Sequence, residues 1–356
     1  MQTLIGDPVF QTYLFAALLF TGVMTTMRKK KVVGSIGVDT TQELKGFAII
    51  AIVLAHVGYY LVTDHRFLFP LSVLAGVGVD IFLFVSGFGI ATSACTREIS
   101  IVQFYRRRLK KIYIPLWIVL AIFFVMDYVL LHKTYAWQYI LHAFTGWFPS
   151  ANLYSDVNSP LWYLSLILLY YLIFPLLFSK RWLPFSALAI YAVTYALASW
   201  TPVGLRENMP LYSIHFLAFP LGVVAAWFAE GKESVRVVIN DYLYYPVVIT
   251  LMGAIGYFAI YSGVGKAPWV AQGISILTVL LVVALFIVNR YEIGLFSLYG
   301  LLSFEVYLLH WPIMFRYDIF FQFLPASLAL TAYLALFIGL GWILHYVSYR
   351  ADSTRH

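Results

Sequence analysis

The chain has 356 residues, of which 62% are hydrophobic and only 11% are charged, and this composition excludes an ordinary soluble domain. A net charge of +7 would suit nucleic-acid binding, but the basic residues stand in short clusters beside long apolar segments, as membrane topology signals do. The single cysteine, Cys95, excludes an internal disulfide. We therefore expect an all-α, polytopic membrane protein that is surrounded by membrane lipid and binds no nucleic acid.

Eleven apolar segments are long enough to cross a bilayer as helices. The expected spans are 8–27, 46–63, 69–94, 112–132, 161–178, 183–200, 211–229, 243–262, 268–289, 294–315 and 326–348. An acidic residue precedes the first span and its basic run follows it, so we expect this span to be retained rather than cleaved as a signal peptide.

The loops between these spans carry an uneven share of the positive charge. If the basic run at 28–31 is cytoplasmic, 18 of the 23 Lys and Arg residues fall on the cytoplasmic side. The exterior five are Arg66, Lys133, Arg206, Lys266 and Arg316. This predicts a multi-pass protein of the cell inner or plasma membrane, with its N-terminus outside and its C-terminus in the cytoplasm. The exterior segment 133–160 suits a short amphipathic helix at the interface.

The second span carries Lys45 and, eleven residues later, His56. Eleven residues are close to three helical turns, so both side chains share one helix face, roughly 16 Å apart. A histidine inside a membrane span faces a cavity or a partner, which makes His56 a functional candidate. The alternative is a packing role, in which the ring hydrogen-bonds to a neighbouring helix.

Two carboxylates lie in later spans and need partners there. Asp80 could pair with His56, fix its tautomer and raise its basicity, or it could form a structural ion pair or line a wet vestibule. Glu305, followed by His310 five residues later, suggests a polar chamber through the bundle, or ion-pair packing. Ser86 stands in a small-residue face that we ascribe to close helix packing rather than to a nucleophile. Asp127 is expected near the outer surface, in contact with water.

A dense basic cluster precedes the fourth span and includes Arg106, Arg107, Arg108 and Lys111. It anchors the topology, and its density beside aromatic residues also suggests a site for phosphate groups. A nucleotide-linked donor such as coenzyme A carries several phosphates, whereas anionic lipid headgroups are the competing ligands. The scattered histidines and the absence of metal-ligand motifs predict no metal site.

Taken together, these stretches resemble the acyltransferase family 3 membrane proteins, which O-acylate carbohydrates. The resemblance rests on Lys45 and His56 with ten residues between them, the phenylalanine-rich run 82–88 that ends in Ser-Gly-Phe, and Arg108 and Lys111 with two residues between them. Later signatures are the Leu-Trp-Tyr-Leu run at 161–164 and the Tyr-Leu-Leu-His-Trp-Pro run at 307–312. The family usually has arginine where this chain has Lys45 and Lys111, and lysine acts there as a point charge.

The resemblance implies a ten-span acyltransferase domain at 40–348. An additional span with its basic cytoplasmic loop would precede it at 1–39, and a cytoplasmic tail would follow at 349–356. The implied activity is transfer of an acyl group, with acetyl as the expected one, from cytoplasmic acyl-CoA to a hydroxyl of an extracytoplasmic or lipid-linked polysaccharide.

The resemblance also implies roles for individual residues. His56 would act as general base or relay the acyl group, with Asp80 or Glu305 orienting its ring. The cations would bind the phosphates of acetyl-CoA: Lys45, Arg106, Arg107, Arg108 and Lys111. The acceptor would contact side chains deeper in the bundle: Ser86, Trp162, Tyr163, Tyr307 and His310.

Two other kinds of protein fit the same sequence. A bundle with buried His, Asp and Glu could be a proton-coupled exporter of a polysaccharide or lipid-linked sugar. The cations in line with His56 favour an enzyme, because transporters typically have paired half-helices instead. A non-catalytic scaffold in a polysaccharide synthesis complex would tolerate loss of His56.

Overall fold

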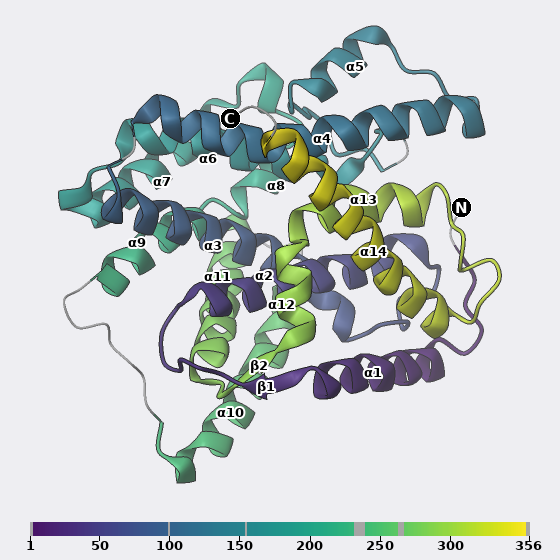
Figure 1. The fold of residues 1–356 in the computed structure, drawn as a ribbon, viewed down its shortest axis with the longest axis horizontal. Coiled ribbons are helices and arrows are strands. Elements are labelled where there is room, and N and C mark those ends of the chain that lie inside the picture. The colour runs from purple at the N-terminus through teal and green to yellow at the C-terminus, as the bar shows by residue number, and fades with distance from the viewer. Residues whose placement is uncertain (1–2, 99, 154, 231–238, 263–266, 354–356) are drawn as a thin grey trace.

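The computed structural model describes residues 3–98, 100–153, 155–230, 239–262 and 267–353, and most of them are helical (Figure 1). The α-helices are α1 (Pro8–Thr25), α2 (Val38–His56), α3 (Ala75–Thr96), α4 (Ile101–Leu131), α5 (Trp137–Phe144), α6 (Trp162–Leu177), α7 (Leu183–Trp200), α8 (Met209–Ser213), α9 (Ala218–Glu230), α10 (Asp241–Tyr261), α11 (Pro268–Val288), α12 (Gly294–Leu301), α13 (Ser303–Phe315) and α14 (Ala326–Ser353). Two short strands, β1 (Met27–Lys29) and β2 (Tyr291–Ile293), pair antiparallel. The prediction of an all-α, polytopic membrane protein is confirmed.

Ten of the helical segments in the described residues are long and apolar enough to cross a membrane. The expected span 294–315 differs, because it consists of two helices, α12 and α13, that meet at 81°. No proline stands at this bend, so the apolar run gave no sign of it. Ser303 begins α13, and its hydroxyl donates a hydrogen bond to the carbonyl of Gly300 across the bend (3.0 Å). The bend places Glu305 in the first turn of α13.

α4 and α14 extend beyond their expected spans. α4 has 31 residues and starts at Ile101 rather than near residue 112, which makes it about 46 Å long. Ser100 caps its first turn by accepting a hydrogen bond from the backbone N–H of Gln103 (3.3 Å). The basic cluster therefore lies on helix rather than in a loop. α14 likewise continues to Ser353, so residues 349–353 of the expected tail are helical, and 354–356 lie outside the described residues.

α2 stands at the centre of the bundle, where α3, α11, α12 and α13 pack against it. Nearly all of its apolar side chains are buried. Gly46 of α2 and Gly300 of α12 allow the two helices to touch, because a Cβ atom on either glycine would overlap the backbone of the other helix. This close approach brings Lys45, the neighbour of Gly46, to the bend between α12 and α13. α1 lies at the edge of the bundle, beside α12 and α14 (Figure 1).

Loops that the sequence assigns to the same side of the membrane contact each other. At the predicted cytoplasmic side, β1 pairs with β2, and the guanidinium of Arg28 donates to the carboxylate of Glu292 (2.7 Å). At the predicted exterior side, the amide of Asn208 donates to the backbone carbonyl of Phe148 (2.8 Å). These contacts agree with the alternation of loops that the charge pattern predicts. Lys266, one of the five exterior cations, lies outside the described residues.

Asp127 is fully buried, so the expectation that it contacts water is wrong. Its carboxylate accepts hydrogen bonds from Arg316, Tyr135 and Tyr317, and Arg316 also donates to the backbone carbonyl of Asp156. These donors replace water around the carboxylate and tie the outer end of α4 to the end of α13. Burial raises the pKa of the Asp156 carboxyl, which lies in the same cluster. The neighbouring α5 is the short helix expected in this exterior segment.

Candidate active site

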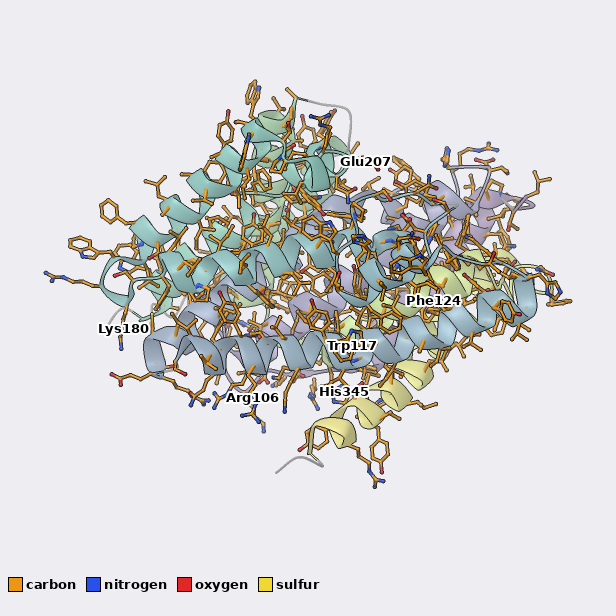
Figure 2. All side chains as sticks on the ribbon, turned by 90° about the horizontal axis from the view of Figure 1, so that it is seen from above. Arg106, Trp117, Phe124, Lys180, Glu207 and His345 are labelled. Carbon is orange, nitrogen blue, oxygen red and sulfur yellow. The ribbon has the colours of Figure 1, made fainter. Side chains whose placement is uncertain are left out.

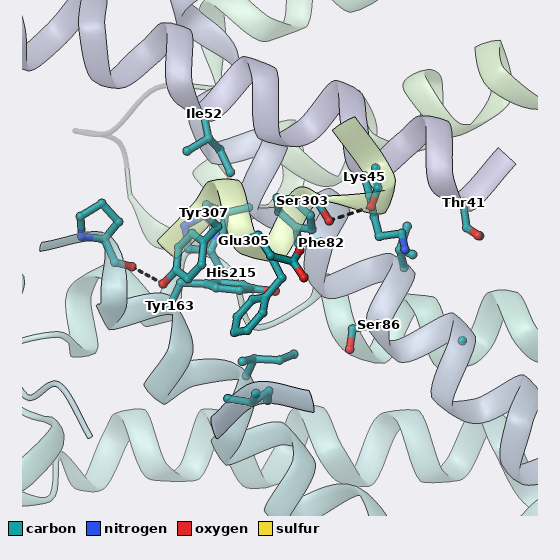
Figure 3. Close-up of a pocket in the computed structure, with 18 of the residues that line it drawn as sticks. Thr41, Lys45, Ile52, Phe82, Ser86, Tyr163, His215, Ser303, Glu305 and Tyr307 are labelled. Atoms are coloured by element: carbon teal, nitrogen blue, oxygen red, sulfur yellow. Dashed lines mark hydrogen bonds between the residues drawn. The ribbon is translucent and has the colours of Figure 1, made fainter. Parts of the chain in front are cut away.

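A cavity of about 1770 Å³ extends through the bundle beside α2. Lys45, Arg108 and Lys111 line it at the predicted cytoplasmic side, and Ser159 and Leu211 line it at the predicted exterior side. Figure 3 shows the middle part, where side chains from α2, α3, α6 and α13 converge. The cavity therefore joins the basic cluster to the interior of the bundle.

Lys45 and His56 lie on one continuous helix, α2, and both line this cavity. The prediction that they share a helix face is confirmed. His56 is the last residue of α2, and a π-helical turn, Val57–Leu61, follows it. Such turns often occur at functional sites, because they change the direction of side chains on one helix face.

The hydrogen-bond partner of His56 is another histidine, His310 of α13. Nδ1 of His56 lies 2.8 Å from Nε2 of His310, and the planes of the two rings are nearly parallel, at 4°. The other nitrogen of His310, Nδ1, lies 2.9 Å from the carbonyl oxygen of Tyr307 and 3.1 Å from that of Val306. His310 is fully buried and lies behind His56, so it does not line the cavity as an acceptor-binding residue would.

These contacts determine the tautomers of the two neutral rings. Carbonyl oxygens only accept hydrogen bonds, so Nδ1 of His310 carries a proton and its Nε2 is an acceptor. Nδ1 of His56 must then donate to that acceptor, which leaves the lone pair of His56 on Nε2. His56 thus has the tautomer of a general base, oriented by a second imidazole instead of a carboxylate.

The expectation that Asp80 orients His56 is wrong, because Asp80 has other partners. One carboxylate oxygen lies 2.8 Å from Nδ1 of His215, and the other accepts a hydrogen bond from the hydroxyl of Ser275. Asp80 and these two partners are all buried. His215 is not among the predicted site residues, because it lies 135 residues from Asp80 and no local motif joins the two.

The expectation that Glu305 orients His56 is also wrong. Its carboxylate lies 2.8 Å from Nδ1 of His345 on α14, and both residues line the cavity. Glu305 attracts the ammonium of Lys45 electrostatically, whereas Lys111 repels it. The bend before α13 explains this placement, because it turns Glu305 toward the basic end of the cavity rather than toward His56.

Only some residues of the basic cluster of α4 line the cavity. Arg108 and Lys111, three residues apart, line the cavity, and Lys110 and Arg97 line it as well. Arg106 and Arg107 are exposed and are not part of the lining, and Figure 2 shows Arg106 at the edge of the molecule. The structure therefore brings Lys45, Arg108 and Lys111 together but leaves Arg106 and Arg107 outside.

The remaining predicted contacts to the acceptor line the cavity: Ser86, Trp162, Tyr163 and Tyr307. The hydroxyl of Ser86 lies 3.0 Å from that of Tyr171, and the hydroxyl of Tyr307 donates to the carbonyl of Pro160 (2.6 Å). Among the described residues, no group of three or more His, Cys, Asp or Glu side chains could hold a metal ion.

Comparisons with known proteins agree on one family. Residues 44–346 match the model of a family described as an acyltransferase domain. Acyltransferase MdmB of Streptomyces mycarofaciens is 30% identical over 145 residues, a stretch that covers 37% of this chain and 37% of that protein. No solved structure matches the chain.

Proposed function

Because the chain belongs to the acyltransferase 3 family of membrane proteins, we propose that it transfers an acyl group, with acetyl as the expected one, from cytoplasmic acyl-CoA to a carbohydrate hydroxyl. The acceptor is an extracytoplasmic or lipid-linked polysaccharide. A single observation carries this proposal: one cavity joins a cationic end to an imidazole whose tautomer is set for base catalysis. The N-terminus lies outside the plasma membrane and the C-terminus inside, in keeping with the distribution of positive charge.

The donor enters from the basic end of the cavity. Lys45, Arg108 and Lys111 bind its phosphates, and Glu305 and His345 line the same cavity. The flexible arm of coenzyme A extends along α2 over the roughly 16 Å between Lys45 and His56, which places the thioester beside the imidazole. Binding at one end and chemistry at the other explains why the cations lie far from His56.

His56 moves the proton in the transfer step. Its Nε2 takes the proton of the acceptor hydroxyl while the hydroxyl oxygen bonds to the thioester carbon, and the carbon–sulfur bond then breaks. The imidazolium returns the proton to the departing thiolate, so the products are an ester and free coenzyme A. His310 accepts a hydrogen bond from Nδ1 of His56 throughout and stabilises the imidazolium. His310 is thus a positioning residue that does not touch substrate.

The test of donor binding compares two pairs of α4 cations, one inside and one outside the cavity lining, in purified protein. Replacing Arg108 and Lys111 by alanine should raise the Kd for acetyl-CoA by about tenfold or more, because two charges that contact phosphate are lost. The matched control replaces Arg106 and Arg107, which carry the same charge outside the cavity lining, and should leave the Kd nearly unchanged. Equal losses in the two double variants would refute a donor site in the cavity.

The test of the base measures acceptor acylation by His56→Ala. Folded variant protein should bind acetyl-CoA as the wild type does, but transfer should fall by a factor of about 10² to 10⁴. Mass spectrometry of surface glycans, with and without the variant, reports the transfer. Retained O-acetylation would reject the base role, and export of an unmodified glycan without any thiol release would identify a transporter instead.

A further inference from the structure

The imidazole of His215 lines the same cavity, and the reaction described above does not use it. His215 lies between α8 and α9, and its ring contacts Asp80 of α3, which in turn contacts Ser275 of α11. Only 3% of His215 is exposed, and Asp80 is not exposed at all. A carboxylate this deep in a membrane protein is costly, and such groups mark functional sites more often than they serve packing.

The hydrogen bonds of Asp80 determine which nitrogen of His215 faces the cavity. Nδ1 is the nitrogen that lies 2.8 Å from the carboxylate, so it carries a proton and donates. Within the part of the chain that the structure describes, this is the only hydrogen bond of the ring. Since His215 lines the cavity, Nε2 is the nitrogen available to a ligand there. The carboxylate behind the ring strengthens any hydrogen bond that Nε2 accepts.

Aromatic side chains complete the wall around His215. The ring of Trp162 stacks on that of His215, with 5.7 Å between centroids and an angle of 21° between planes. Trp162 and the adjacent Tyr163 both line the cavity, and Figure 3 shows Tyr163 beside His215. A wall of aromatic rings with a few fixed polar groups suits a ligand that has apolar ring faces and hydroxyls at its rim.

A second hollow leads to this wall from the predicted exterior side. It has a volume of about 650 Å³ and shares Ala151, Leu211, Ile214 and Ala271 with the main cavity. Ile214 is the neighbour of His215 in the chain, so the two hollows meet beside the imidazole. Polar side chains line the outer hollow, among them those of Ser150, Glu207 and Asn208.

We propose that the wall formed by His215 and Trp162 is the acceptor subsite, and that it binds a polyhydroxylated ring which enters through the outer hollow. Nε2 of His215, held by Asp80, accepts a hydrogen bond from one hydroxyl, while His56 deprotonates another. This inference rests on the proposed function and names the recognition chemistry of its acceptor. The competing interpretation is that the buried pair only holds α3, α9 and α11 together.

The experiment uses full-length protein in nanodiscs, with acetyl-CoA as donor and methyl β-D-glucoside as probe. Thiol release without the probe reports donor chemistry with water as acceptor, and mass spectrometry with the probe reports acylated glucoside. With wild-type protein, the glucoside should either become acylated or block the hydrolysis of acetyl-CoA. Cyclohexanol, a ring with one hydroxyl, should have a weaker effect. His215→Gln should raise the half-saturating glucoside concentration at least tenfold and leave the half-saturating acetyl-CoA concentration unchanged.

His142→Gln, in exposed α5, is the matched control and should behave as the wild type. If His215→Gln does not fold, Trp162→Leu and Ser275→Ala test the same wall and should shift the glucoside concentration in the same direction. Variants with an unchanged glucoside response, or a wild type that releases thiol but ignores the glucoside, would overturn this inference alone. A wild type that neither binds acetyl-CoA nor releases thiol would overturn the proposed function itself.

Discussion

The contact between His56 and His310 joins residues 254 positions apart in the chain. In its neutral form, each ring alone could carry its proton on either nitrogen. The carbonyls of Val306 and Tyr307 fix the proton of His310 on Nδ1, and His310 in turn fixes the proton of His56 on its own Nδ1. The selection resembles the role of the aspartate in a Ser-His-Asp triad, but the group that orients the base here is an imidazole rather than a carboxylate.

Replacing His310 by alanine tests this arrangement at the scale of one residue. The variant should lose kcat by a factor of about 10² to 10⁴, because the wrong tautomer of His56 becomes accessible and its imidazolium loses an acceptor. The Kd for acetyl-CoA should not change, since His310 lies outside the cavity lining. Both constants come from thiol-release kinetics and equilibrium binding, with His142→Ala as the control. An unchanged kcat would show that His310 is only packing.

At the scale of elements, glycines decide how closely the helices around the site approach. Gly87 of α3 lies against the backbone of α9 at Phe219, and Gly222 of α9 lies against α3 at Phe84. An added Cβ atom would overlap a carbonyl oxygen in either position. We expect the small residues around Ser86 to serve close helix packing, and the contact of Gly87 agrees with this. Ser86 itself lines the cavity.

Gly87→Ala should lower the thermal unfolding midpoint of the protein, because α3 and α9 must separate to make room for the methyl group. Gly253→Ala in α10 is the matched control, since nothing lies within 4 Å of the Cβ position there. The control should be neutral or stabilising by up to about 1 kcal/mol, as alanine favours helix over glycine. Scanning fluorimetry in detergent measures both variants. Equal midpoints would contradict a close crossing at Gly87.

At the scale of the whole molecule, the orientation in the membrane decides which end of the cavity meets the donor. The charge distribution assigns the loop with Arg181 to the cytoplasm and the loop with Arg206 to the exterior. Both residues are exposed, whereas the native Cys95 is buried. Contacts between loops of the same side fit this assignment at both ends of the bundle.

Cysteine labelling tests the orientation directly. A membrane-impermeant maleimide should label Arg206→Cys in intact cells, and Arg181→Cys only after lysis, because the bilayer shields the cytoplasmic loop. The parent protein with Cys95 alone should remain unlabelled in both conditions. The opposite pattern would invert the orientation and place the basic end of the cavity outside the cell, where acyl-CoA is not supplied.

The sequence by itself determined the fold class, because long apolar segments in a chain this poor in charge have no stable alternative to membrane helices. It also determined that Lys45 and His56 share a face, since helical periodicity follows from spacing alone. The family resemblance rested on such local runs as well. These features need only contacts within about one helix.

Only the tertiary structure decided which groups meet. Asp80 with His215, Glu305 with His345 and His56 with His310 are contacts between residues 40 to 254 positions apart in the chain, and local patterns carry no information about them. The same holds for the bend at Leu302, which no proline marks, and for which cations of the basic cluster line the cavity. Buried polar groups must find partners, but which partner each one finds depends on how the helices pack.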